Sequence, residues 1–152
     1  MIDTQNFLVQ AMDQALETMA FLTVIPDEEN MIVPEKTILA EMSFSGPRNG
    51  TIQILSGTDF AEVIAENIGA MDQVNDEMRF DALKELSNVT CGLLIPMIAS
   101  TESDVFDLTV PVVKASDDAP NWQEFIMQQN ACIVNVDGFG VATRLILSEQ
   151  QT

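Results

Sequence analysis

The stretch that decides the fold is residues 78–98, MRFDALKELSNVTCGLLIPMI. Four of its residues are spaced i, i+4, i+7 and i+11: Asp81, Glu85, Asn88 and Gly92. At about 100° per residue, a helix places them on one stripe roughly 60° wide, which we call the polar stripe. Mostly apolar positions fall on the opposite side: Leu83, Leu86, Thr90, Leu93, Leu94 and Met97. This pattern predicts a helix that packs on a core through one face and presents polar groups on the other.

Gly92 is the unusual member of the polar stripe. A glycine inside a helix costs roughly 1 kcal/mol relative to alanine, so a compensating role is expected. Without a side chain, it would let a partner approach the helix backbone closely. The alternative is that the polar stripe is only a solvated helix face, as on many surface helices.

An incomplete second copy of the polar stripe occurs earlier, in QAMDQALETMAFLTVIP. Asp13, Glu17 and Ala20 each lie 68 positions before their counterparts, and Val24 occupies the glycine position. This offset predicts one domain built from two tandem halves, about 1–70 and 71–152. A chance match between two amphipathic helices is the alternative. If the duplication is real, only the second half carries the complete stripe.

The remaining pattern predicts further helices and strands. A first helix is expected from Asp3 or Thr4 to about Phe21, and a short one over 60–68. A polar turn at 26–30, an acidic connector at 71–77 and a loop at 116–121 separate the elements. Alternating apolar residues predict strands at 36–46, 50–57, 104–114, 131–136 and 140–147, with hairpin turns before Gly50 and at 137–138. Pro96 should kink or end the long helix.

Together these elements predict an α+β fold. Two long helices, each opening a duplicated helix-plus-strands unit, would pack on a mostly antiparallel sheet. Trp122 and Phe125 could face a partner or pack on the sheet, and packing is the more common fate of aromatic side chains.

Composition narrows the function classes. The chain has 24 acidic and 6 basic residues and a net charge of −18. This charge disfavours nucleic acid and anionic membranes and favours partners with a basic patch. We find no run of 18 apolar residues for a membrane span. The N-terminal segment lacks the basic region of a secretory signal, so we expect a cytoplasmic protein.

The sequence contains no histidine. This excludes Ser-His-Asp and Cys-His catalysis and a zinc site with histidine ligands. Cys91 and Cys132 show no metal-binding spacing; a cytosolic setting favours thiols, although a disulfide between them stays open. Catalysis would therefore use carboxylates, carboxamides, hydroxyls or a metal held through oxygen.

The motif Asp81-x3-Glu85-x2-Asn88, followed after 22 intervening residues by Pro111, resembles the signature of the CheC/CheX/FliY phosphatases of bacterial chemotaxis. In that family the glutamate and the asparagine are the functional pair. CheC proteins usually keep both residues in both halves, whereas CheX-type members keep one complete site. Because its first copy ends in alanine, this chain resembles the CheX type, and the CheC-like fold is also a duplicated helix-plus-strands unit.

The resemblance implies a substrate, namely the aspartyl phosphate of a CheY-like response regulator that carries its own Mg²⁺. Asn88 would orient the attacking water, and Glu85 would pair with the regulator's active-site lysine. Asp81 would extend this contact and Gly92 would allow close approach. The resemblance implies no covalent intermediate, no metal or other cofactor bound by this chain, and a homodimer formed through sheet edges.

Two other interpretations stay open at this point. One is a non-catalytic acidic adaptor of the same fold that binds a response regulator or a flagellar-switch protein. The other is an acidic domain of unrelated function with a solvated stripe. The enzyme depends on the amide of Asn88, whereas an adaptor depends mostly on charge and contact area.

Overall fold

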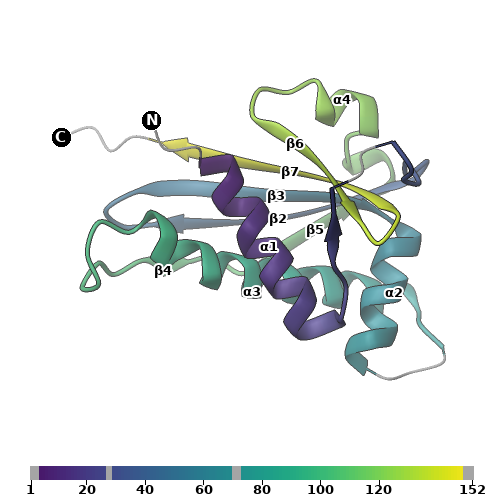
Figure 1. Cartoon of the computed structure of the whole chain (residues 1–152), viewed down its shortest axis with the longest axis horizontal. Coiled ribbons are helices and arrows are strands. Elements are labelled where there is room, and N and C mark those ends of the chain that lie inside the picture. The colour runs from purple at the N-terminus through teal and green to yellow at the C-terminus, as the bar shows by residue number, and fades with distance from the viewer. Residues whose placement is uncertain (1–3, 27–28, 70–72, 149–152) are drawn as a thin grey trace.

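Seven strands form one sheet in the computed structural model, which describes residues 4–26, 29–69 and 73–148 (Figure 1). The helices are α1 (Thr4–Ala20), α2 (Thr58–Gly69), α3 (Asp76–Ile98) and α4 (Trp122–Ile126). The strands are β1 (Val24–Ile25), β2 (Thr37–Ser45), β3 (Asn49–Gly57), β4 (Asp107–Leu108), β5 (Val112–Ala115), β6 (Ala131–Val136) and β7 (Phe139–Ser148). A 3₁₀ turn, η1 (Ser116–Asp118), lies before α4.

The two sides of the sheet are arranged alike about its central pair, β3–β7. On each side a hairpin partner comes next, followed by a short edge strand. The order is β1-β6-β7-β3-β2-β4, and β5 also pairs with β2. The hairpins β2–β3 and β6–β7 meet at the central pair β3–β7, and the named strand pairs are antiparallel. Each edge is completed by the other half, because β1 pairs with β6 while β4 and β5 pair with β2. This arrangement is what a duplicated unit predicts.

Helices α1 and α3 lie in contact across one face of the sheet, and α2 packs beside α3 (Figure 1). Their apolar sides bury every third or fourth residue against β2, β3 and β7, as the helical period requires. The buried side chains include Leu8, Met12 and Leu16 of α1, Leu83, Leu86 and Leu94 of α3, and Met42, Ile52, Ile54 and Leu145 of the sheet. The predicted α+β class, with two long helices on a mostly antiparallel sheet, is confirmed.

The opposite face of the sheet carries α4 (Figure 1). Trp122 and Phe125 are buried there against Leu39, Leu55 and Ala142. The interpretation that this aromatic pair packs on the sheet is therefore confirmed, and the partner-facing one is wrong. Helix α4 was not predicted; Asn121 caps it, accepting a hydrogen bond from Glu124 N at 2.8 Å.

Two predicted elements have other bounds than expected, and one strand was missed. Helix α3 begins at Asp76, two residues early, because Asn75 Oδ1 accepts from Met78 N at 2.9 Å and caps it. Residues 104–114 form two short strands, and the first begins only at Asp107, since Asp104 lies in the loop after α3 and accepts from Ser100 N at 2.8 Å. Strand β1, which pairs with β6, was not predicted at all. Pro96 lies inside the last turn of α3 without ending it before Ile98.

Some predictions fall on residues outside the described ranges. These are a helix cap by Asp3, the centre of the turn at 26–30 and the start of the connector at 71–77. The proposed boundary between the halves lies there too, so it stays a prediction. In the part of the chain that the structure describes, no helix is long and apolar enough to cross a membrane.

Candidate functional site

The polar stripe lies on the solvent side of α3. Asp81, Glu85, Asn88 and Gly92 are all exposed. The opposite side of the helix is buried, with Leu83, Leu86 and Thr90 fully inaccessible to solvent. The predicted division of this helix into an anchoring face and a presenting face is therefore confirmed as geometry. The functional roles of the four residues stay predictions.

The polar side chains of the stripe have no partner within the described residues. Neither a hydrogen bond nor an ion pair engages the carboxylates of Asp81 and Glu85 or the carboxamide of Asn88. These groups are therefore available to a second molecule. An amide is useful here because its carbonyl oxygen accepts a hydrogen bond while its NH₂ group donates.

Gly92 leaves an open place at the end of the stripe. A Cβ atom built on this residue would meet no heavy atom within 4 Å apart from its chain neighbours and the adjacent backbone of α3. Packing inside the chain therefore does not require a glycine here. The position is compatible with the predicted close approach of a partner to the helix backbone.

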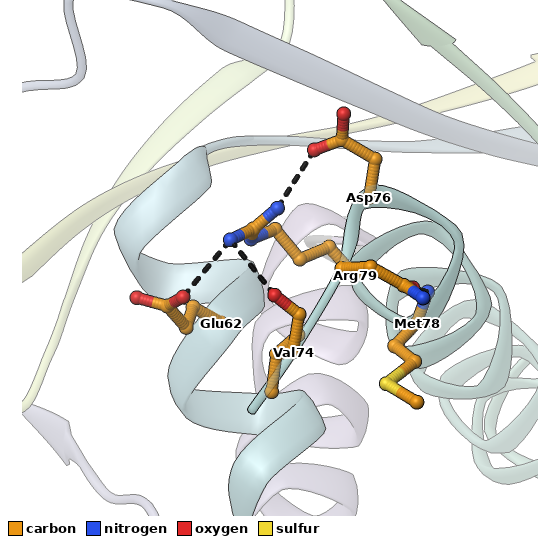
Figure 2. Close-up of polar contacts among 6 residues, drawn as sticks. Glu62, Val74, Asp76, Met78 and Arg79 are labelled. Carbon is orange, nitrogen blue, oxygen red and sulfur yellow. Dashed lines mark hydrogen bonds and ion pairs between the residues drawn. The ribbon is translucent and has the colours of Figure 1, made fainter. Parts of the chain in front are cut away.

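Arg79 fixes the start of α3, as Figure 2 shows. Its guanidinium donates to Glu62 Oε1 of α2 at 2.9 Å, to Asp76 Oδ1 at 2.7 Å and to the carbonyl oxygen of Val74 at 3.2 Å. The hydrogen bond to Glu62 raises the pKa of Arg79. Since the three acceptors come from α2, the connector and α3, this contact orients the first turn of α3, which leads into the polar stripe.

Pro111 is buried between β4 and β5. Its ring has no N–H group and cannot donate to a neighbouring strand, which fits the gap between these two short strands. Strand β5 contacts α3. Pro111 therefore shapes the strand region that supports the stripe-bearing helix.

The incomplete copy of the stripe on α1 is mostly bonded or buried within the chain. Asp13 Oδ1 accepts from Val24 N at 3.2 Å and thereby ties the helix to β1. Ala20 is fully buried, and its carbonyl oxygen accepts from Asn67 Nδ2 of α2 at 2.7 Å. Glu17 alone is exposed like its counterpart. The first half therefore cannot present a carboxamide at the matching position.

Several surface hollows of the described chain do not include the stripe. Three of them, of about 390, 600 and 770 Å³, are lined by residues of α1, α2, the first turns of α3, the sheet strands and the connecting loops. None of their lining residues belongs to the polar stripe. A convex, exposed helix face suits a protein surface better than a small molecule, which needs a concave site.

Other candidate chemistry is not supported. Cys91 is buried on the core side of α3, and burial raises its pKa to about 11, so it is a neutral thiol near pH 7. Cys91 and Cys132 form no disulfide, which settles the question that the sequence left open. Within the described ranges, no group of three or more acidic or cysteine side chains could hold a metal ion.

Sequence reasoning overlooked several residues around the stripe. Asn75, in the acidic connector, caps α3 by accepting from Met78 N. Arg79 lies in the first turn of α3, and its ion pair with Glu62 depends on α2. Lys84 is half-buried on α3 and precedes Asn88 by one helical turn. The i, i+4 spacing from Asn88 was the one available signal for Lys84.

Comparison with known proteins places these observations in a family. Residues 38–125 match the family described as chemotaxis phosphatase CheX, a range that includes the polar stripe and Pro111. The fold is similar to that of chemotaxis protein CheX from Desulfovibrio desulfuricans (TM-score 0.73, 18% identity, covering 97% of this chain and 100% of that one). CheX from Vibrio vulnificus is similar too (TM-score 0.71, 18% identity, 97% of each chain). So is a chain of the CheX-CheY-BeF₃-Mg²⁺ complex from Borrelia burgdorferi (TM-score 0.64, 18% identity, 98% and 100%). A search of curated proteins finds no match.

Proposed function

Because the chain belongs to the CheX family of chemotaxis phosphatases, we propose that it accelerates hydrolysis of the aspartyl phosphate of a CheY-like response regulator. The observation that carries this proposal is the exposed polar stripe, whose carboxamide and carboxylates have no partner within the described residues. The solved complex from Borrelia burgdorferi contains CheX, CheY, BeF₃ and Mg²⁺. A regulator of this kind, carrying its own Mg²⁺, is the partner we propose.

Asn88 would act on the attacking water. Phosphoryl transfer depends mainly on positioning the nucleophile in line and on stabilising charge that spreads over the phosphoryl oxygens. The Asn88 carbonyl can accept from the water while its NH₂ donates to an oxygen nearby. By analogy with oxyanion-hole donors, such a group is worth about 10²–10³ in rate.

The other stripe residues would hold the regulator in place. Glu85, one turn before Asn88, would pair with the regulator's active-site lysine, and Asp81 would extend this charge contact. Gly92, with open space around it, would let the regulator reach the helix backbone. No group of this chain needs to form a covalent phosphoenzyme, because the water attacks directly. We place this reaction in the cytoplasm.

The edge formed by β4 and β5 supports a further proposal, that the chain is a homodimer. Val105, Leu108, Val110 and Val112 lie on or beside this edge, and their side chains are 46% to 80% exposed. Open strand edges with apolar side chains are prone to pair with another strand. Sedimentation equilibrium checks this: we expect a dimer for the wild type and a monomer for Val110→Lys. A monomeric wild type contradicts it.

A non-catalytic adaptor is the competing function, and a kinetic experiment separates the two. The dephosphorylation rate of each phosphorylated CheY-type regulator from the same cell is measured with wild type, Asn88→Ala and Glu85→Gln. Glu17→Gln is the matched control, because Glu17 is the exposed counterpart of Glu85 on α1.

We expect the wild type to accelerate one regulator and Asn88→Ala to lose about 10²–10³ of that acceleration while still binding. Glu85→Gln should weaken binding, and Glu17→Gln should behave as wild type. Binding without acceleration by the wild type would favour the adaptor. Equal losses in Glu17→Gln and Glu85→Gln would contradict the assignment to α3.

A further inference from the structure

Lys84 is a basic side chain at the border of the polar stripe. It is half-buried on α3, and none of the ion pairs between described residues includes it. Asp81 lies three residues before it on the exposed face, yet no contact within 4 Å joins the two charges. A cation beside carboxylates that it does not neutralise is available for an anion from outside.

Helix geometry brings Lys84 close to Asn88. The two residues are spaced i, i+4, so their Cβ atoms lie roughly 5–6 Å apart. Side chains on a helix lean toward its N-terminus, so the Asn88 carboxamide leans over the turn that carries Lys84. An anion held at the Asn88 amide therefore lies within reach of the flexible Lys84 side chain.

No other basic residue has this placement. Of the six basic residues, Arg79 is bonded to Glu62 and Asp76, while Lys114 and Arg144 lie on strands of the sheet. Lys36 precedes β2, and Arg48 lies in the turn between β2 and β3. With a net charge of −18, the surface repels a phosphoryl group unless a local cation offsets that repulsion.

We propose that Lys84 contacts the phosphoryl oxygens of the docked aspartyl phosphate and makes binding selective for the phosphorylated regulator. This inference rests on the proposed function and assigns a specificity role to a residue outside the family motif. A charge-assisted hydrogen bond from Nζ forms only when the phosphoryl group is present. Its loss is expected to cost about tenfold in affinity for that form.

The test compares two forms of the CheY-type regulator that the wild type dephosphorylates fastest. One form carries Mg²⁺ and beryllofluoride, which stands in for the phosphoryl group, and the other carries Mg²⁺ alone. Affinities for both are measured with wild type, Lys84→Gln and Lys84→Arg. Lys36→Gln is the control, since it removes the same charge from another lysine without a described ion pair.

We expect Lys84→Gln to lower the ratio of the two affinities about tenfold, by weakening only the beryllofluoride form. Lys84→Arg should keep most of the selectivity, and Lys36→Gln should not change it. Lys84→Met, which retains an apolar stem, gives the same comparison if Lys84→Gln is unstable by thermal unfolding.

Two results would overturn the inference while leaving the phosphatase intact. In one, Lys84→Gln keeps the wild-type ratio. In the other, it weakens both forms equally, as expected if Lys84 contacts carboxylates of the regulator or only steers association by charge. A wild type that accelerates no regulator contradicts the proposed function itself, and this inference with it.

Discussion

Helices α1 and α3 begin from the same pattern and end with different roles. Both carry aspartate, then glutamate four residues later, and both lie on the same face of the sheet. On α3 the fourth turn exposes Asn88, whereas on α1 the matching Ala20 is fully buried. The aspartates differ as well, because Asp13 is bonded to the backbone of β1 while Asp81 has no partner within the described residues.

The difference teaches that a repeated helix can be divided between anchoring and recognition. On α1, the end of the stripe is enclosed by α2 and β1, so an amide there would be a buried polar group without a useful partner. On α3, the helix continues for 10 residues beyond Asn88 to Ile98, so the stripe stays on an open surface. The complete motif therefore lies on the helix whose neighbouring elements leave space for a partner.

The largest predicted effect comes from placing an asparagine at the matching position of α1. Ala20→Asn should lower the free energy of unfolding by about 3 kcal/mol, because it overfills the core and buries an unsatisfied amide. Urea unfolding measures this, with Asn88→Ala as the matched control, which should change stability by less than about 0.5 kcal/mol. A tolerated Ala20→Asn that gains phosphatase activity would show that the two helices are equivalent.

The next largest predicted loss of stability comes from removing the ion pairs of Arg79 at the start of α3. Arg79→Met should lower the free energy of unfolding by about 1.5 kcal/mol, because the Arg79 side chain is only 18% exposed. The loss is not larger, because its two carboxylate partners are more open to solvent. Thermal unfolding at low and high salt checks it, with Lys36→Met as the control. If these contacts of Arg79 also orient the polar stripe, Arg79→Met should lower the rate of regulator dephosphorylation. An unchanged rate would restrict Arg79 to stability.

Substituting the matching aspartates, Asp13 and Asp81, should have smaller and different effects on stability. Asp13→Ala should lower the free energy of unfolding by about 1 kcal/mol, because Val24 N loses its acceptor. Asp81→Ala should leave stability within about 0.5 kcal/mol and weaken regulator binding instead. Chemical unfolding and binding assays on both variants decide the point. Similar stability losses at both positions would remove the distinction between an anchoring and a recognising carboxylate.

The smallest predicted change goes in the opposite direction. Gly92→Ala should raise the free energy of unfolding by up to about 1 kcal/mol, because alanine favours a helix and its Cβ meets no atom within 4 Å outside the adjacent backbone of α3. The same methyl group should weaken docking of the regulator. Stabilisation without any loss of binding would indicate that the open backbone at Gly92 is not used.

Much of this protein follows from its sequence. The helical spacing from Asp81 to Gly92 predicts which face of α3 is exposed, and apolar alternation predicts the two hairpins that form the centre of the sheet. Both are short-range signals, since helix and strand periods are set by local backbone geometry. The motif with its distant proline also indicates the family, which the match over residues 38–125 shows.

Tertiary structure decided the rest. The sequence does not say that Ala20 is enclosed or that Arg79 binds Glu62, because each depends on an element distant in the chain. The edge strands are likewise completed by the other half of the molecule. Periodicity determines the face that a residue occupies, but only the packing of neighbouring elements determines whether that face is covered or left open to a partner.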